Sequence, residues 1–176
     1  MLNNFYWVIE NELAGMALPT ASRAYAYLEN ADQAAQEEMQ RETQDLKDRS
    51  IGAVVSLTEY PIAEKSFTDA DVHYLHIPVP DMTAATQSQI KEFVAFAQQN
   101  NQDKRAVVVH CLGGMGRTGT MAACYLVSKG YASNNAIKTV RQCRPGAIET
   151  RWQEESIIEY EMLLKNPASD IGDGLL

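Results

Sequence analysis

Residues 106–119 read Ala106-Val107-Val108-Val109-His110-Cys111-Leu112-Gly113-Gly114-Met115-Gly116-Arg117-Thr118-Gly119. The run of valines predicts a buried strand, the glycines after it predict a tight loop, and residues 120–129 are rich in good helix formers. The sequence therefore predicts a strand, a loop and a helix in direct succession. Cys111 and Arg117 would lie at the start of that helix.

The glycines suit this loop to bind an anion. Gly113, Gly114 and Gly116 allow the backbone to turn its N–H groups inward, and a helix N-terminus adds partial positive charge. Arg117 would curl back, and its planar guanidinium can hold two phosphate oxygens at once, which a lysine cannot do. A thiol in the same field loses its proton easily. We therefore expect a phosphate site in which Cys111 is the nucleophile.

Two other ligand-binding motifs compete for the same residues. Residues 114–119 also satisfy G-x-G-x-x-G, the dinucleotide fingerprint, which requires an acidic residue about 20 positions further on, at the end of a second strand. Thr139 stands there instead, in a stretch predicted to be helical. A Walker loop requires Gly-Lys before its Ser or Thr, whereas this chain has Gly116-Arg117. The two alternatives are therefore disfavoured.

The loop His110-Cys111-x5-Arg117-Thr118-Gly119 resembles the signature loop of the cysteine-dependent protein tyrosine phosphatases, in particular the small atypical dual-specificity branch and its archaeal members. Four further blocks resemble the same branch, over nearly the whole chain: Leu13-Ala14-Gly15-Met16-Ala17-Leu18-Pro19, Val55-Ser56-Leu57-Thr58-Glu59, His76-Ile77-Pro78-Val79-Pro80-Asp81 and Arg144-Pro145-Gly146-Ala147-Ile148-Glu149-Thr150. The resemblance implies a phosphatase with no cofactor and no metal, whose partner is a phosphorylated protein or peptide.

Composition bounds the architecture and the partners. A chain of 176 residues with 45% hydrophobic content can bury one good core. We expect a single catalytic domain over residues 1–165 and a loose tail over residues 166–176. The net charge of −8 argues against nucleic-acid or anionic-membrane binding, and no apolar run approaches membrane-spanning length.

The three cysteines indicate the compartment. Cys124 and Cys143 lack the spacing of a metal site and are most simply small buried hydrophobes, and three cysteines cannot pair completely. A working thiolate needs a reducing compartment. The apolar run over residues 5–9 is short and is followed by acidic residues, which is not typical of a signal peptide. We expect a monomeric, intracellular protein in the cytoplasm.

The remaining chain alternates strands and helices. Apolar runs predict strands over residues 5–9, 13–18, 51–57 and 72–77, the first two as an edge hairpin. Helical periodicity and caps predict helices over residues 20–28, 87–100, 118–129, 134–144 and 150–165. Residues 29–50 are interpreted as a helical insertion, because the corresponding connection is shorter in the small members of the family that the chain resembles. The predicted fold is α/β, with a central four- to five-stranded, mostly parallel sheet, helices on both faces, and the Cys111 loop at the carboxyl end of a central strand.

A phosphatase also needs an acid, because a proton delivered to the leaving oxygen is worth about 10²–10⁴-fold in rate. Asp81 ends a proline-stiffened loop after a strand parallel to the one before Cys111, so both loops can open on the same edge of the sheet. The resemblance implies that Asp81 is the general acid and then the base that activates water. Taken alone, a Pro-Asp turn is usually only a turn. The fallback acids are Asp69, Asp71 and Glu149.

Several neighbours of the loop have predicted supporting roles. The Thr118 hydroxyl can donate to the sulfur and stabilise it as a leaving thiolate. By resemblance His110 holds the loop in shape, although a histidine at a strand end is more often structural. By resemblance Glu149 or Gln153 orients the hydrolytic water, yet Thr150-x-x-Gln153 also satisfies a capping box that would merely start the last helix.

The predicted substrate-binding residues are Leu112, Gly113, Gly114, Met115, Gly116 and Arg117. Residues 112–116 carry no Lys or Arg, whereas phosphoinositide-directed relatives usually have basic residues there, which disfavours lipid headgroups. The resemblance implies hydrolysis of phosphotyrosine first, with phosphoserine and phosphothreonine as further substrates. The alternatives are a phosphatase of a non-protein ester and a phosphopeptide-binding module without turnover. A pure binding module would not need the Cys111 thiol.

Overall fold

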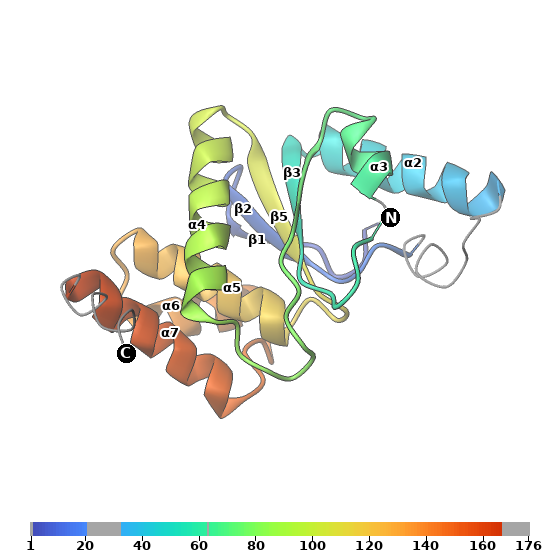
Figure 1. Cartoon of the computed structure of the whole chain (residues 1–176). Coiled ribbons are helices and arrows are strands. Elements are labelled where there is room, and N and C mark those ends of the chain that lie inside the picture. Colours follow the sequence, from blue (N-terminus) through green and yellow to red (C-terminus); the bar gives the residue numbers. More distant parts are fainter. Residues whose placement is uncertain (1, 21–32, 63, 167–176) are drawn as a thin grey trace, which may run out of the picture.

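The structure, a computed structural model, describes residues 2–20, 33–62 and 64–166, which form five strands and six helices (Figure 1). The strands are β1 (Tyr6–Ile9), β2 (Leu13–Met16), β3 (Ile51–Ser56), β4 (His73–His76) and β5 (Ala106–His110). The helices are α2 (Gln33–Asp48), α3 (Glu64–Thr68), α4 (Gln87–Gln102), α5 (Gly116–Ser128), α6 (Ser133–Cys143) and α7 (Arg151–Lys165).

The strands form one sheet in the order β1-β2-β5-β3-β4. Strands β2, β5, β3 and β4 are parallel, and only the edge strand β1 runs antiparallel, against β2. The strand that leads to Cys111 is central, because Val108 of β5 pairs with Ala14 on one side and Val54 on the other. The predicted α/β fold with a mostly parallel sheet is confirmed.

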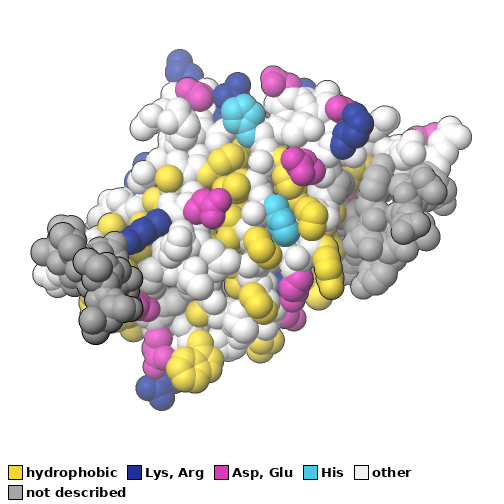
Figure 2. Space-filling view, in the orientation of Figure 1, with side chains coloured by type: hydrophobic (Ala, Val, Ile, Leu, Met, Phe, Trp, Pro, Cys, Tyr) yellow, Lys and Arg dark blue, Asp and Glu magenta, His cyan; other side chains and the backbone are white. Residues whose placement is uncertain are grey.

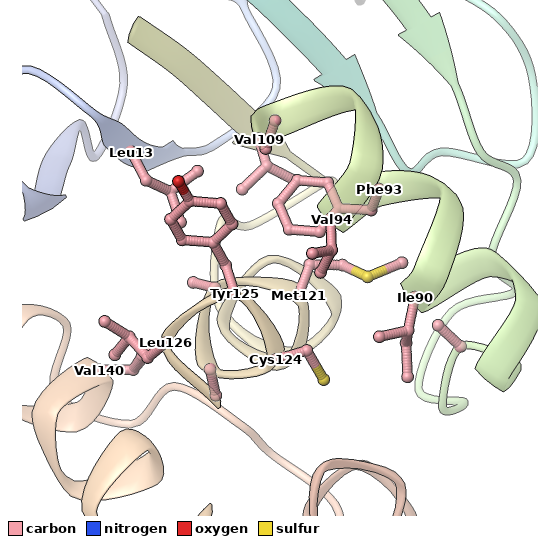
Figure 3. Packing of buried hydrophobic residues seen from close by; sticks show 14 of the residues in the cluster. Leu13, Ile90, Phe93, Val94, Val109, Met121, Cys124, Tyr125, Leu126 and Val140 are labelled. Carbon is pink, nitrogen blue, oxygen red and sulfur yellow. The ribbon is translucent and has the colours of Figure 1, made fainter. Parts of the chain in front are cut away.

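The valines of β5 pack against helices on both faces of the sheet. Val107 and Val109 belong to a core shared with α4, α5, α6 and α7, which lie together on one face (Figures 1 and 3). In this core Phe93 of α4 and Tyr125 of α5 meet edge to face at 6.5 Å between ring centroids. Because successive side chains of a strand point to opposite faces, a strand covered on both sides reads as a continuous apolar run.

The other face is covered by α2 and α3. Met39 and Leu46 of α2 and Phe67 of α3 pack against Val54 and Val108 in a second core. The thin apolar stripe of α2 is thus buried, while the rest of the helix is polar. The described residues of the 29–50 segment are helical, and its being an insertion stays a prediction. Helix α3 was not predicted, because it has only five residues and buries one side chain, Phe67.

Several element boundaries differ by one or two residues from those predicted, among them the three that follow. Strand β2 ends at Met16, because the next N–H group, of Ala17, donates to the carbonyl of Asn3 at 2.9 Å. Helix α5 begins at Gly116, not at Thr118. Helix α6 begins at Ser133, whose N–H donates to Oε2 of Glu161 in α7 at 2.9 Å.

Some predictions fall on residues that the structure does not cover. The helix predicted over residues 20–28 and the tail predicted over residues 166–176 lie, save for Thr20 and Asn166, outside the described residues. No helix in the described part of the chain is long and apolar enough to cross a membrane.

Candidate active site

The Cys111 loop lies where the carboxyl ends of the parallel strands meet. His110, the last residue of β5, pairs with Met16 of β2 and with Ser56 of β3, so the segments that follow these strands all leave the sheet at the same edge. Ligands of open α/β sheets bind at this edge. The loop spans residues 111–115, and α5 begins directly after it.

Hydrogen bonds hold three carbonyl groups of this loop outward, those of Leu112, Gly114 and Met115. The backbone N–H of Leu18 donates to Leu112 O at 3.2 Å, and the Tyr6 hydroxyl donates to Gly114 O at 3.2 Å. Met115 O accepts from the N–H groups of Gly119 at 2.9 Å and Ile148 at 3.4 Å. The amides of residues 112–116, in contrast, donate to no other residue within the described ranges. A run of unpaired N–H groups in one loop is the structural basis of an anion nest.

The start of α5 adds to this nest. Helices α4 and α7 begin with capping boxes, in which the Thr86 and Thr150 hydroxyls accept from backbone amides. The N-cap of α5 is Met115, which makes no side-chain cap. The first amides of α5 therefore keep their hydrogen-bonding capacity and partial positive charge for a ligand.

The loop packs closely on the end of β2 at Gly114. The φ angle of Gly114 is +70°, in the left-handed region that favours glycine. A Cβ atom added there would lie 2.5 Å from the carbonyl of Met16 and 2.6 Å from the nitrogen of Ala17. Only a glycine can therefore bring the loop this close to the neighbouring strand.

Cys111, the first residue of the loop, is buried, as are the nearby His110 and Thr118. Cys111 is 3% exposed, so a phosphorus atom can reach its sulfur only after the phosphate group has entered the loop. Thr118 is fully buried, and its hydroxyl has no hydrogen-bond partner among the described residues, which leaves a donor free beside Arg117. His110 is fully buried, with Nδ1 3.5 Å from the Cys111 carbonyl oxygen. Burial lowers the pKa of His110 to about 4, so its ring is neutral at neutral pH.

Arg117 ties the Cys111 loop to the loop that carries Asp81. Its side chain is buried, and Nη1 donates to the carbonyl of Val79 at 2.9 Å while Nη2 lies 2.8 Å from Oδ1 of Asp81. Nη1 also lies 3.3 Å from Oε2 of Glu59. Nη1 donates as well to the carbonyl of Leu57 at 3.4 Å, so one guanidinium holds two carboxylates and two backbone carbonyls.

Glu59 completes this connection from the end of β3. Its Oε1 accepts from the backbone N–H of Asp81 at 2.9 Å, while its other oxygen faces Arg117. Hydrogen bonds from its own N–H and that of Asp81, together with the Arg117 charge, hold the pKa of Glu59 below its usual value. Glu59 therefore stays ionised and bridges the two loops.

A family model described as "Swiss Army Knife protein, DSP-PTPase phosphatase domain" matches residues 2–157 of this chain. The chain belongs to this phosphatase family. The resemblance seen in the sequence is thereby confirmed.

Curated relatives of this family match part of the chain. Dual specificity protein phosphatase CDC14B of Mus musculus is 34% identical over 119 residues, covering 66% of this chain and 24% of CDC14B. Dual specificity protein phosphatase CDC14A of Homo sapiens is 35% identical over 104 residues, covering 58% of this chain and 17% of CDC14A. The chain spans about a quarter or less of the length of these two relatives.

Solved structures match nearly the whole chain. Tk-PTP in its active form superposes with a TM-score of 0.74 at 28% identity, covering 92% of this chain and 99% of Tk-PTP. PTPMT1 superposes with a TM-score of 0.75 at 21% identity, covering 94% of this chain and 98% of PTPMT1. The fold is therefore that of small phosphatases of this superfamily.

In this DSP-PTPase domain, two of the predicted fallback acids lie away from the loop. Asp69 and Asp71 precede β4, at the amino edge of the sheet, whereas Cys111 follows the carboxyl end of β5. Asp69 is paired there with Lys65 at 2.6 Å. Parallel strands separate these two edges by their whole length, so neither carboxylate can reach a phosphate held by the loop.

Glu149 and Gln153 do lie beside the loop. A Cβ atom on Gly116 would lie 2.5 Å from Oε2 of Glu149 and 2.9 Å from Nε2 of Gln153. Gln153 is fully buried and forms the predicted capping box with Thr150, while its Nε2 donates to the carbonyl of Thr83 at 3.1 Å. The predicted capping box is therefore confirmed, and the assignment of the hydrolytic water to Glu149 or Gln153 stays a prediction. Glu149 is exposed next to the start of α5.

Two further residues of the site escaped the sequence analysis. Glu59 follows a strand that neighbours β5, and that position could have marked it as a candidate. Tyr6 belongs to the edge hairpin, and nothing in its sequence surroundings points to the Cys111 loop. Within the described ranges, no group of three or more His, Cys, Asp and Glu side chains could hold a metal ion.

Proposed function

We propose that this domain hydrolyses phosphate monoesters of proteins, phosphotyrosine first and phosphoserine or phosphothreonine as further substrates, through a phosphocysteine intermediate. One observation carries the proposal. The unpaired amides of residues 112–116 lie next to the Cys111 thiol in the sequence. Arg117, which follows directly, holds the Asp81 carboxylate nearby, with Nη2 2.8 Å from Oδ1. An anion site, a nucleophile and an acid are thus adjacent, and membership of the phosphatase family supports the same chemistry.

Phosphate binding begins with an exchange of partners at Arg117. A phosphate dianion accepts hydrogen bonds from the loop amides and competes with the Asp81 carboxylate for Nη2 of Arg117. This exchange releases the Asp81 carboxyl group from Nη2, so that it can serve as the proton donor. Glu59 and the Val79 carbonyl keep Nη1 in place during this exchange, because they bind the other end of the guanidinium.

The first displacement forms the phosphocysteine. The Cys111 thiolate attacks phosphorus in line with the ester bond, the P–O bond breaks, and Asp81 delivers its proton to the departing oxygen. The loop amides and Arg117 stabilise the charge on the three equatorial oxygens of phosphorus.

The second displacement regenerates the thiolate. Asp81 takes a proton from a water molecule, the water oxygen attacks phosphorus, and the S–P bond breaks to release inorganic phosphate. The buried Thr118 hydroxyl, which has no partner in the described part of the chain, donates to the departing sulfur. We assign the orientation of this water to Glu149, because the polar atoms of Gln153 already bind Thr83 and the start of α7.

The surroundings of the loop favour a protein substrate. Leu112, next to the nucleophile, is 47% exposed, and Met82, next to Asp81, is 53% exposed. Hydrophobic side chains gather along the middle of the face in Figure 2, beside α4, with acidic side chains among them. Apolar side chains suit an aryl phosphate within a peptide better than a polyanionic headgroup.

Two alternatives remain open to experiment. PTPMT1, a neighbour in fold, has been solved in complex with PI(5)P, so a non-protein ester is one of them. The other is a phosphopeptide-binding module without turnover. We also propose an intracellular, reducing location, because the nucleophile has to stay reduced and the three cysteines are free thiols.

The proposal is tested by the hydrolysis of para-nitrophenyl phosphate in the presence of a metal chelator. Wild type should turn over, and Cys111→Ser should not. Cys124→Ala is the matched control and should stay active, because Cys124 is buried in the core and burial raises the pKa of its thiol, which keeps it protonated. Turnover by Cys111→Ser would refute the mechanism, and an inactive wild type that binds phosphopeptides would favour the binding module.

A further inference from the structure

Tyr6 reaches the Cys111 loop from the edge strand of the sheet, β1. It belongs to β1 and pairs with Gly15 of β2. A Cβ atom added to Gly15 would overlap the Tyr6 ring and would lie 2.5 Å from its hydroxyl oxygen. The missing side chain at Gly15 therefore lets the ring cross β2 toward the loop.

The Tyr6 hydroxyl donates to the carbonyl oxygen of Gly114 at 3.2 Å. Burial raises the pKa of Tyr6, with the nearby Cys111 as the next cause, so the hydroxyl remains a donor at any pH at which a phosphatase works. The same Gly114 has φ +70° and packs against the backbone of Met16 and Ala17. The hydrogen bond thus acts at a position of the loop that is closely packed and restricted to glycine.

Among the hydrogen-bonded carbonyls of the loop and of the first residue of α5, Gly114 O differs in the origin of its donor. Leu112 O and Met115 O are bound by backbone amides, and Gly116 O is bound by Thr120 of the same helix. Gly114 O is bound by a side chain from a different strand. Its orientation can therefore be changed by a point substitution outside the loop and helix.

We propose that Tyr6 is a positioning residue that keeps the Gly114 carbonyl turned away from the phosphate and so turns the Met115 N–H toward it. The two groups belong to one planar trans peptide, in which the C=O and N–H bonds point in opposite directions, so fixing one fixes the other. Without the Tyr6 hydroxyl this peptide can rotate, and rotation would place a carbonyl oxygen against the anion. The inference rests on the proposed function of the loop.

Tyr6→Phe is the direct test, because it keeps the ring on Gly15 and removes only the hydroxyl. We expect the inhibition constant of inorganic phosphate to rise and kcat/KM for para-nitrophenyl phosphate to fall, each by about two- to tenfold, the range for one neutral hydrogen bond. The melting temperature should fall by no more than about a few degrees, as expected for the loss of one hydrogen bond. Gly15→Ala, which displaces the ring but retains the hydroxyl, should weaken phosphate binding in the same direction.

Tyr125→Phe is the matched control. Its hydroxyl is bound to Glu12 and Asn101 at the amino end of the parallel strands, whereas the Cys111 loop follows their carboxyl end. This variant should therefore lose stability but keep the wild-type inhibition constant for phosphate. A folded Tyr6→Phe with wild-type phosphate affinity would overturn the role of Tyr6 alone. If Tyr6→Phe does not fold, an unchanged phosphate affinity in Gly15→Ala would overturn it. A wild type that neither hydrolyses the ester nor binds phosphate would instead refute the proposed function.

Discussion

Replacing Gly114 by alanine tests how strongly the loop depends on its contact with β2. A left-handed conformation costs an L-residue about 1–2 kcal/mol. The new Cβ would lie 2.5 Å from the Met16 carbonyl, a backbone group that cannot rotate away, and overpacking of this kind costs about 1–3 kcal/mol. If the loop stays in place, the free energy of unfolding should fall by about 2–5 kcal/mol.

The loop can avoid part of that loss by moving off β2, but movement breaks the hydrogen bonds to Leu112 O and Gly114 O. We then expect kcat/KM for para-nitrophenyl phosphate to fall by about 100-fold or more, because a displacement of about 1 Å has that effect on positioned groups. Urea unfolding and steady-state kinetics measure the two losses.

Gly113→Ala is the matched control for stability. No atom lies within 4 Å of a Cβ added at Gly113, so its free energy of unfolding should stay within about 0.5 kcal/mol of wild type. If Gly114→Ala had the stability and the kcat/KM of wild type, the close packing of the loop on β2 would be irrelevant to catalysis and our reasoning would be wrong.

Three further predictions concern single side chains. Asp81→Asn should lower kcat/KM by about 10²–10⁴-fold and remove the basic limb of its pH profile; retention of that limb would exclude Asp81 as the acid. Thr118→Ala should slow the second displacement more than the first, so rapid-quench kinetics should show a larger burst of alcohol release than in wild type; an unchanged burst would contradict the role of its hydroxyl. Burial lowers the pKa of His110 to about 4, whereas the pKa of a histidine in an unfolded chain is about 6.5. Between these two pH values the unfolded chain binds a proton that the folded chain does not. The free energy of unfolding of wild type should therefore fall by up to about 3 kcal/mol as pH falls from about 6.5 to about 4. Urea unfolding of His110→Gln should show a weaker dependence on pH over that range, and an equally steep one would refute the assignment.

The sequence predicts those parts of the fold that rest on long apolar patterns. The valines of β5, the apolar run of β3 and the periodic face of α4 each identify their element, because burial on both faces of a sheet leaves little freedom in residue type. Short polar elements carry no such signal, and α3 was therefore missed.

The candidate site is predictable to the extent that it lies on one loop. Glycines between a strand and a helix indicate an anion site at Cys111 and Arg117 without any knowledge of tertiary structure. The sequence also predicts Asp81 at the same edge of the sheet as Cys111, from the two strands that precede them. The contacts of the Arg117 side chain with Asp81 and Glu59 are not predictable in this way, because sequence spacing does not show which side chains meet. The contact of Tyr6 with Gly114 joins residues 108 positions apart and needs the sheet order as well.

The most direct test of the account is to identify the phosphorylated atom during turnover. Thr118→Ala should be mixed with para-nitrophenyl phosphate, quenched in acid within the burst phase, and analysed by intact and peptide mass spectrometry. We predict one phosphoryl group per chain, bound to Cys111 and absent when Cys111 is replaced by serine. A phosphoryl group on any other residue, or rapid turnover with no phosphorylated protein at any time, would contradict the central claim that the Cys111 sulfur is the nucleophile.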